Sequence, residues 1–118
     1  MGMSACYGRV KTADLPGRYR AEYQFGEETL TLRPDGTFSQ IFLIREGPKI
    51  GSNLGRWAYD SKDRMLDLQT FRVVSDGYCH RTSEDFVGGS SVSVEREFFL
   101  VGRIRLGPDE GCPLLATR

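Results

Sequence analysis

The sequence predicts an all-β protein, an antiparallel up-and-down meander of seven to nine strands. The meander forms a small barrel or a strongly curved, incompletely closed sheet. Apolar and polar residues alternate with a period of two in segments separated by turn signals, and no stretch shows the 3.6-residue period of a helix. Fourteen glycines, seven phenylalanines, five tyrosines and one tryptophan suit an aromatic-rich β protein with many turns.

Length and charge limit the class of protein. A chain of 118 residues makes one domain that buries roughly two thirds of its unfolded surface. Sixteen basic and sixteen acidic residues cancel, and no long block of like charge occurs, so we expect no nucleic-acid partner. No apolar run approaches the roughly 18 residues of a membrane-spanning helix. The sequence leaves the oligomeric state open.

Residues 1–16 show no periodicity and are predicted to form a flexible tether, with the β domain at 17–118. Ser4 and Ala5 stand directly before Cys6, and small residues in this place are typical of lipoprotein processing, which attaches lipid to the cysteine. The charged and apolar segments of a signal peptide do not precede Cys6. Two interpretations follow: Cys6 carries a lipid after removal of a signal peptide, or Cys6 is an ordinary exposed cysteine of a cytoplasmic protein.

The first strands are predicted from residue 17 onward. One face of the first strand carries Tyr19, Ala21, Tyr23 and Phe25. Residues 28–33 form the second, with Leu30 and Leu32 toward the core, and the Pro34-Asp35-Gly36 turn leads into the third. The inner face of the third strand carries Phe38, Gln40, Phe42 and Ile44. Because Ile41 and Leu43 make its other face apolar too, we expect this strand in the middle of the sheet.

Residues 46–54 have the composition of a loop, and strand four is predicted at 55–60. It carries Trp57 and Tyr59 on one face, and we expect Trp57 to be largely buried. A charged turn at 61–64 leads into strand five at 65–74. There Leu66, Leu68 and Thr70 are predicted to share the inner face.

Residues 75–91 interrupt the alternation and predict a long loop. Its candidate chemical groups are Tyr78, His80, Arg81, Glu84 and Asp85. His80 with Glu84 or Asp85 is a candidate acid–base pair, and His80 alone a candidate haem or metal ligand. No nucleophile motif accompanies them, and a loop is a poor platform for precise geometry, so we expect neither an enzyme nor a cofactor or metal.

The chain returns to alternation at 92–100, bends at Gly102 and completes a strand at 103–106. Residues 108–111 form a turn before a short last strand, which Pro113 is expected to confine to an edge. The cysteines divide into the lipid carrier Cys6 and a possible disulfide between Cys79 and Cys112; two reduced thiols are the alternative.

A resemblance appears once these segments are placed in order. It rests on the sequences at 14–19 (DLPGRY), 26–32 (GEETLTL), 35–38 (DGTF), 55–57 (GRW) and 102–106 (GRIRL). This order resembles small bacterial lipocalin-like lipoproteins, most of which have no assigned activity. The resemblance implies a small barrel over about residues 14–111 and favours lipid on Cys6. It therefore implies a location at the bacterial cell envelope, with membrane contact only through that lipid; a cytoplasmic location is the alternative.

The predicted barrel interior leads to two function classes. Its candidate lining residues are Tyr19, Tyr23, Phe38, Gln40, Phe42, Trp57 and Tyr59. They either fill the core or line a pocket for a small apolar or amphipathic ligand. Gln40 favours the pocket, because a buried amide needs a hydrogen-bond partner. A cavity above about 300 Å³ would favour ligand binding. A filled core with an exposed, uncharged edge strand would favour an interaction module.

Overall fold

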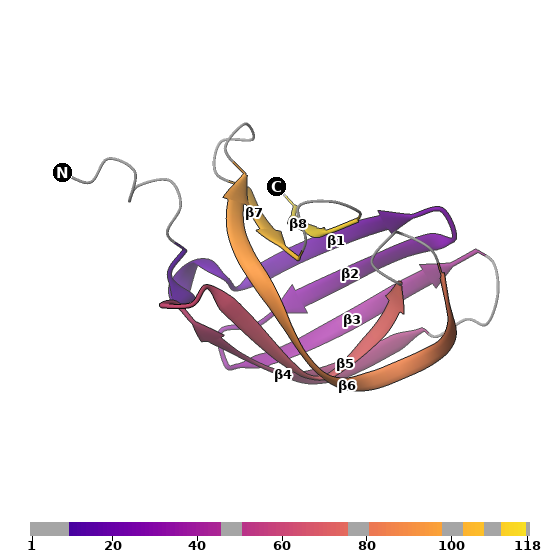
Figure 1. The fold of residues 1–118 in the computed structure, drawn as a ribbon, viewed down its shortest axis with the longest axis horizontal. Helices are drawn as coiled ribbons and strands as arrows, with labels where there is room; N and C mark the ends of the chain where they lie inside the picture. Colours follow the sequence, from indigo (N-terminus) through magenta and orange to yellow (C-terminus); the bar gives the residue numbers. More distant parts are fainter. Residues whose placement is uncertain (1–9, 46–50, 76–80, 98–102, 108–111, 118) are drawn as a thin grey trace.

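The chain folds as eight antiparallel strands that follow one another in sequence order and close into a barrel (Figure 1). The computed structural model describes residues 10–45, 51–75, 81–97, 103–107 and 112–117. The strands are β1 (Gly17–Tyr23), β2 (Gly26–Leu32), β3 (Thr37–Ile44), β4 (Ser52–Asp60), β5 (Met65–Ser75), β6 (Arg81–Glu97), β7 (Arg103–Leu106) and β8 (Leu114–Ala116). The predicted all-β meander of seven to nine strands is confirmed.

The last strand closes the barrel. β8 pairs with β7 through Leu106↔Leu114 and with β1 through Tyr19↔Ala116. The prediction that this strand lies at an edge was wrong, because Pro113 precedes the strand and removes no hydrogen bond from its ladders. Every strand therefore has a neighbour on both sides, and the sheet closes completely.

The alternation predicted for the first three strands is confirmed. Burial alternates strictly in β2, where Leu30 and Leu32 are buried, and the inner face of β3 is buried from Phe38 to Ile44. The Phe38 ring lies against the backbone of Gly55, where an added Cβ would come within 2.4 Å of the ring. Glycine at this place lets the aromatic core pack tightly on β4.

β3 lies between β2 and β4, as the sequence predicted for a strand in the middle of the sheet. Its outer face is nevertheless open to solvent, and Ile41 and Leu43 are 52% and 61% exposed. In a closed barrel every strand is central, and its outer face meets solvent regardless of position. Apolarity on both faces therefore did not indicate burial on both faces.

β2, β4 and β5 differ in detail from their predictions. β2 spans Gly26–Leu32 instead of 28–33. β4 begins at Ser52, three residues before the prediction, because the ladder with β3 extends to Ile41↔Ser52. In β5 the pairing with β6 shifts register between Leu68 and Phe71, and Thr70 in this bulge has φ 54° and is exposed. Phe71, rather than the predicted Thr70, takes the inward place.

The predicted long loop at 75–91 was wrong over most of its length. Residues 81–91 belong to β6, a 17-residue strand that curves around the barrel and pairs first with β5 and then with β7 (Figure 1). Its polar and small residues gave no alternating pattern, but pairing with β5, in spite of two register shifts, holds it in strand conformation. Gly88 and Ser90 lie opposite the inward Phe71 and Leu68. The small inward side chains of β6 thus leave space inside the barrel.

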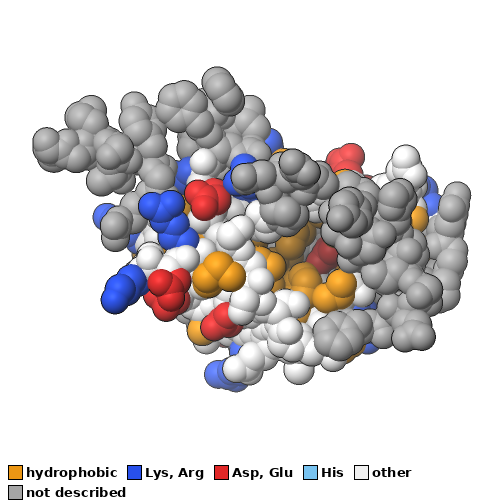
Figure 2. Space-filling view, viewed as in Figure 1, with side chains coloured by type: hydrophobic (Ala, Val, Ile, Leu, Met, Phe, Trp, Pro, Cys, Tyr) orange, Lys and Arg blue, Asp and Glu red, His pale blue; other side chains and the backbone are white. Residues whose placement is uncertain are grey.

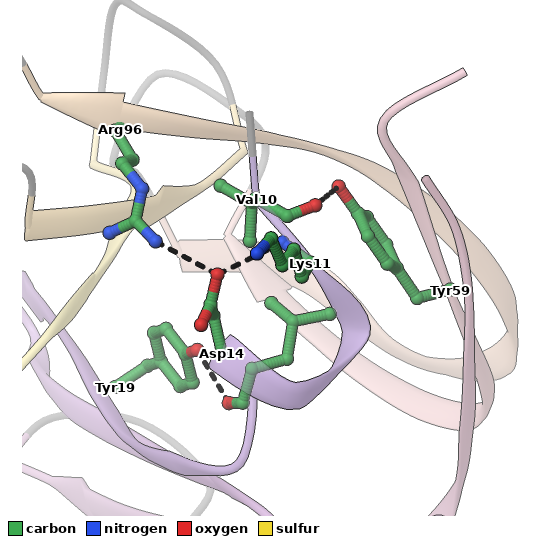
Figure 3. Close-up of polar contacts among 7 residues, drawn as sticks. Val10, Lys11, Asp14, Tyr19, Tyr59 and Arg96 are labelled. Carbon is green, nitrogen blue, oxygen red and sulfur yellow. Dashed lines mark hydrogen bonds and ion pairs between the residues drawn. The ribbon is translucent and has the colours of Figure 1, made fainter. Parts of the chain in front are cut away.

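One end of the barrel is closed by the segment before β1 (Figure 3). Val10 and Leu15 flank the 3-10 turn η1 (Thr12–Asp14) and are buried. The Tyr59 hydroxyl donates to the Val10 carbonyl at 2.9 Å, and the Tyr19 hydroxyl donates to the Leu15 carbonyl at 2.6 Å. Residues 10–16, predicted as tether, therefore belong to the folded domain; residues 1–9 lie outside the described ranges.

A surface ion pair also holds this segment, which we call the plug (residues 10–16). The Asp14 carboxylate accepts a hydrogen bond from the Arg96 guanidinium of β6 at 3.0 Å and another from the Lys11 backbone N–H at 3.0 Å (Figure 3). Burial raises the pKa of Tyr19, so its hydroxyl stays protonated as the donor to the plug. The plug thus tethers β1, β4 and β6 at one end of the barrel.

Candidate functional site

The end of the barrel opposite the plug contains a partly enclosed cavity of about 230 Å³. Apolar side chains from β5 to β8 form most of its wall: Phe71, Val73, Val74, Val92, Leu106 and Leu114. The polar residues that border it are Tyr23, Glu28 and Arg72, together with the small Ser90. Figure 2 shows apolar side chains gathered over the middle of the face in view. The arrangement is an apolar chamber with a carboxyl group in its wall.

Glu28 is a buried acid that follows from the register of β2. It points inward with Leu30 and Leu32, and only 2% of its surface is exposed. The Tyr23 hydroxyl donates to Oε1 of Glu28 at 2.8 Å, and Nε2 of Gln40 donates to Oε2 at 2.8 Å. Both donors are neutral. Each carboxylate oxygen thus has one protein hydrogen bond.

Gln40 connects this carboxylate to the wall of the barrel. Its side-chain amide donates to the Arg72 carbonyl at 3.0 Å, and its Oε1 accepts from the Arg72 backbone N–H at 3.0 Å. The ladder between β4 and β5 runs only from Met65 to Gln69, so Arg72 lies beyond it. The Gln40 side chain therefore takes the place of a neighbouring strand for Arg72.

Asn53 provides the remaining hydrogen bond of the Gln40 side chain. Its Nδ2 donates to Oε1 of Gln40 at 2.7 Å and to the Thr70 carbonyl at 2.6 Å. Gln40 thus makes four hydrogen bonds, all with protein groups. The partner that the sequence analysis sought for its amide is the protein itself, so Gln40 is no evidence for a ligand.

The electrostatics of the site follow from burial. Removal from water raises the pKa of Glu28, and the hydrogen bonds from Gln40 and Tyr23 lower it by less. Burial also raises the pKa of Tyr23, with a further contribution from the Glu28 charge. No ion pair to Glu28 occurs among the described residues. When it is ionised, the Glu28 carboxylate is therefore buried without an ion-pair partner among the described residues.

The residues predicted to line the barrel interior differ in burial and in role. Tyr19, Phe38 and Phe42 are buried core residues, while Trp57 and Tyr59 are half-buried. The hydrogen-bonded side chains around Glu28 form what we call the polar cluster: Tyr23, Glu28, Gln40 and Asn53. Of the predicted interior residues, Tyr23 and Gln40 belong to it, and Tyr23 also lines the cavity. Trp57 donates through its indole N–H to the Arg33 carbonyl at 2.9 Å. Sequence reasoning missed Glu28, although its spacing from Leu30 and Leu32 was the signal that placed it inside.

Several predicted groups lie outside the described residues: Cys6, Tyr78, Cys79 and His80. Arg81, Glu84 and Asp85 lie in β6 instead of a loop, and their side chains are outside the description. Cys112 borders the cavity and is disulfide-bonded. In the described ranges, no group of three or more His, Cys, Asp or Glu side chains is arranged to hold a metal ion. The same ranges contain no helix long and apolar enough to cross a membrane.

Comparison with family models, curated proteins and solved structures finds no match. The site must therefore be interpreted from its own geometry. A second hollow of about 410 Å³ lies outside the barrel, lined by outward residues such as Arg20, Glu22 and Leu115. Of these two spaces, the interior cavity is the smaller one, and it is the one that combines barrel walls with the buried carboxyl group of Glu28.

Proposed function

We propose that this protein is a non-enzymatic binding protein that holds a small apolar or amphipathic molecule in the cavity at the end of the barrel opposite the plug. The cavity of about 230 Å³ carries the proposal, because it combines apolar walls with the Glu28 carboxyl and the Tyr23 hydroxyl. Ligand sites typically pair such walls with a few polar groups that orient the ligand.

The volume sets the size of the ligand. The cavity is smaller than the roughly 300 Å³ that would favour ligand binding by size alone, so the proposal depends on the chemistry of the wall, and a large ligand is not expected. An apolar cavity of about 150 Å³ takes benzene, and by that ratio this cavity takes roughly eight to ten non-hydrogen atoms. The proposed ligand is therefore a small molecule with a compact apolar body.

The alternative function is an interaction module with no ligand. A partner cannot add a strand to an edge of this sheet, because every strand of the closed barrel is paired on both sides. A partner would have to use the outer wall, where Ile41, Leu43 and Leu54 are exposed. The interior cavity has no role in that alternative, and we therefore prefer ligand binding.

We also propose that the protein is a lipocalin-like lipoprotein of the bacterial cell envelope, anchored by lipid on Cys6; a cytoplasmic location is the alternative. Because the plug begins at Val10, only residues 7–9 separate it from Cys6. Four residue steps reach at most about 14 Å. An anchor on Cys6 would hold the plugged end near the membrane and turn the cavity away from it. Expression with the native upstream sequence tests this: Cys6→Ala should leave the membrane fraction, and equal partitioning of both proteins would favour the cytoplasm.

A pair of variants tests ligand binding. Ser90 points into the cavity and its neighbour Ser91 points outward, so Ser90→Leu fills the cavity and Ser91→Leu is the matched control. The probe is 2-phenylethanol, followed by changes in the backbone amide spectrum. We expect shifts at Val92 and Leu106 in the wild type and in Ser91→Leu, and loss of binding in Ser90→Leu. Absence of any shift in the wild type, or equal binding by both variants, would contradict the proposal.

A further inference from the structure

We propose that the ligand is a small primary monoamine whose protonated nitrogen binds the Glu28 carboxylate; this inference rests on the proposed function. It names the chemical class of the ligand from the groups that form the polar part of the cavity. The counter-charge to the buried acid would come from the ligand.

Charge is the first argument. The Glu28 carboxylate borders the cavity, and its protein partners are the neutral Tyr23 hydroxyl and the neutral Gln40 amide. Arg72 borders the same cavity but makes no ion pair with Glu28. A buried charge without a partner costs several kcal/mol, and an ammonium group in contact with it recovers much of that cost. An anionic ligand would instead add a second negative charge beside Glu28.

Hydrogen-bonding capacity is the second argument. A carboxylate offers about four acceptor sites, and Tyr23 and Gln40 occupy two of them. The Tyr23 hydroxyl donates its hydrogen bond to Glu28, so its own lone pairs remain available as acceptors. The polar wall is thus rich in acceptors. An ammonium group has three donors and no acceptor, and it complements this wall better than an alcohol with a single donor does.

The rest of the cavity decides between a monoamine and a longer amine. Among the described residues, most of the wall beyond Glu28 and Tyr23 is apolar, formed by Phe71, Val74, Val92, Leu106 and Leu114, while Arg72 and Ser90 also border the space. A second ammonium group would lie against apolar side chains and near the cationic Arg72 instead of a second acid. The cavity has space for roughly eight to ten non-hydrogen atoms, which suits an amine with one compact phenyl or short alkyl group.

Three probes of one shape test the inference: 2-phenylethylamine, its neutral isostere 2-phenylethanol, and the anion phenylacetate. Dissociation constants are measured by titration calorimetry or amide shifts at neutral pH and low salt. We expect the amine to bind at least about tenfold more tightly than the alcohol, and phenylacetate more weakly than both. Equal binding of amine and alcohol, or a preference for the anion, would overturn the amine inference and leave ligand binding intact. No binding by any probe would overturn the proposed function as well.

Two neighbouring acids supply the matched variants. Glu28→Gln keeps the size of the side chain and can still bond Gln40 and Tyr23, so the barrel should fold. It should lower the amine-to-alcohol ratio to about one, mainly by weakening the binding of the amine. Glu27 points outward and pairs with Arg20, so Glu27→Gln should keep the wild-type ratio. If Glu28→Gln kept the amine preference, Glu28 would not be the site. The wild-type probe comparison decides the ligand class even if a variant fails to fold.

Discussion

Gln40→Leu is the most direct test of the hydrogen-bond arrangement inside the barrel. Leucine is close to glutamine in size, so it fills the space but cannot make the four hydrogen bonds of the amide. Three groups lose a partner and remain shielded from water: Oε2 of Glu28, the Arg72 N–H and the Arg72 carbonyl. Asn53 keeps its bond to Thr70.

The expected loss follows from these three groups. An unsatisfied buried polar group costs roughly 1–2 kcal/mol in a partly buried setting, which gives a total of about 3–6 kcal/mol. This is a large share of the roughly 5–15 kcal/mol that stabilises a domain. At roughly 4 °C for each kcal/mol, the melting temperature should fall by about 12–24 °C.

Urea unfolding followed by circular dichroism and Trp57 fluorescence measures this change. Ser39→Leu is the control, because Ser39 is the outward neighbour on the same strand; it should change stability by less than about 0.5 kcal/mol. Glu28→Leu combined with Gln40→Leu should cost less than the sum of the single variants, since the pair removes both partners of one bond. A loss below about 1 kcal/mol for Gln40→Leu would refute the argument that Arg72 depends on it.

Three further predictions concern single residues. Burial raises the pKa of Glu28 above its ordinary 4.5, so its contribution to stability is complete below pH 4.5 and is lost as pH rises through the folded pKa. The difference between wild type and Glu28→Gln in urea unfolding should show this decline, at most about 1.4 kcal/mol per pH unit, and a flat difference from pH 4 to 8 would contradict it. Thr70→Gly should stabilise the protein by about 1 kcal/mol, because φ 54° strains a β-branched residue, whereas Thr70→Val should show no gain in the urea midpoint. Trp57→Ala should cost about 2–3 kcal/mol in thermal melts, less than the roughly 3–5 of a fully buried tryptophan, because Trp57 is half-buried; an unchanged melting temperature would contradict its packing.

Local patterns predicted most of the strands because strand geometry is itself local. The period-two alternation around Leu30 and Leu32 placed the inner face of β2, and Pro34 with Gly36 specified the turn into β3. The alternation did not predict the structure at two places, one in β5 and one in β6. Thr70 left the inner face at a bulge, and β6 carries small and polar residues whose strand conformation depends on pairing with β5.

The candidate site could be predicted only in part. Tyr23 and Gln40 were placed inside by their spacing along their strands, and the same rule would have placed Glu28 inside. An acid on an inner face is stable only when it has partners, and the spacing does not identify them. The partners of Glu28 are Tyr23 of β1 and Gln40 of β3. The spacing of residues along one strand does not show whether side chains of other strands lie within hydrogen-bond distance.

The sequence by itself determined an antiparallel meander, its first turns and the inner faces of its regular strands, because each of these depends on residues within a few positions of one another. Tertiary structure alone decided that the barrel closes through β8, that residues 10–16 plug one end, and that a polar cluster borders a cavity at the other. These features depend on contacts between residues far apart in the chain, such as Gln40 and Arg72, which are 32 positions apart. A buried acid or amide becomes stable only when such distant groups supply its hydrogen bonds.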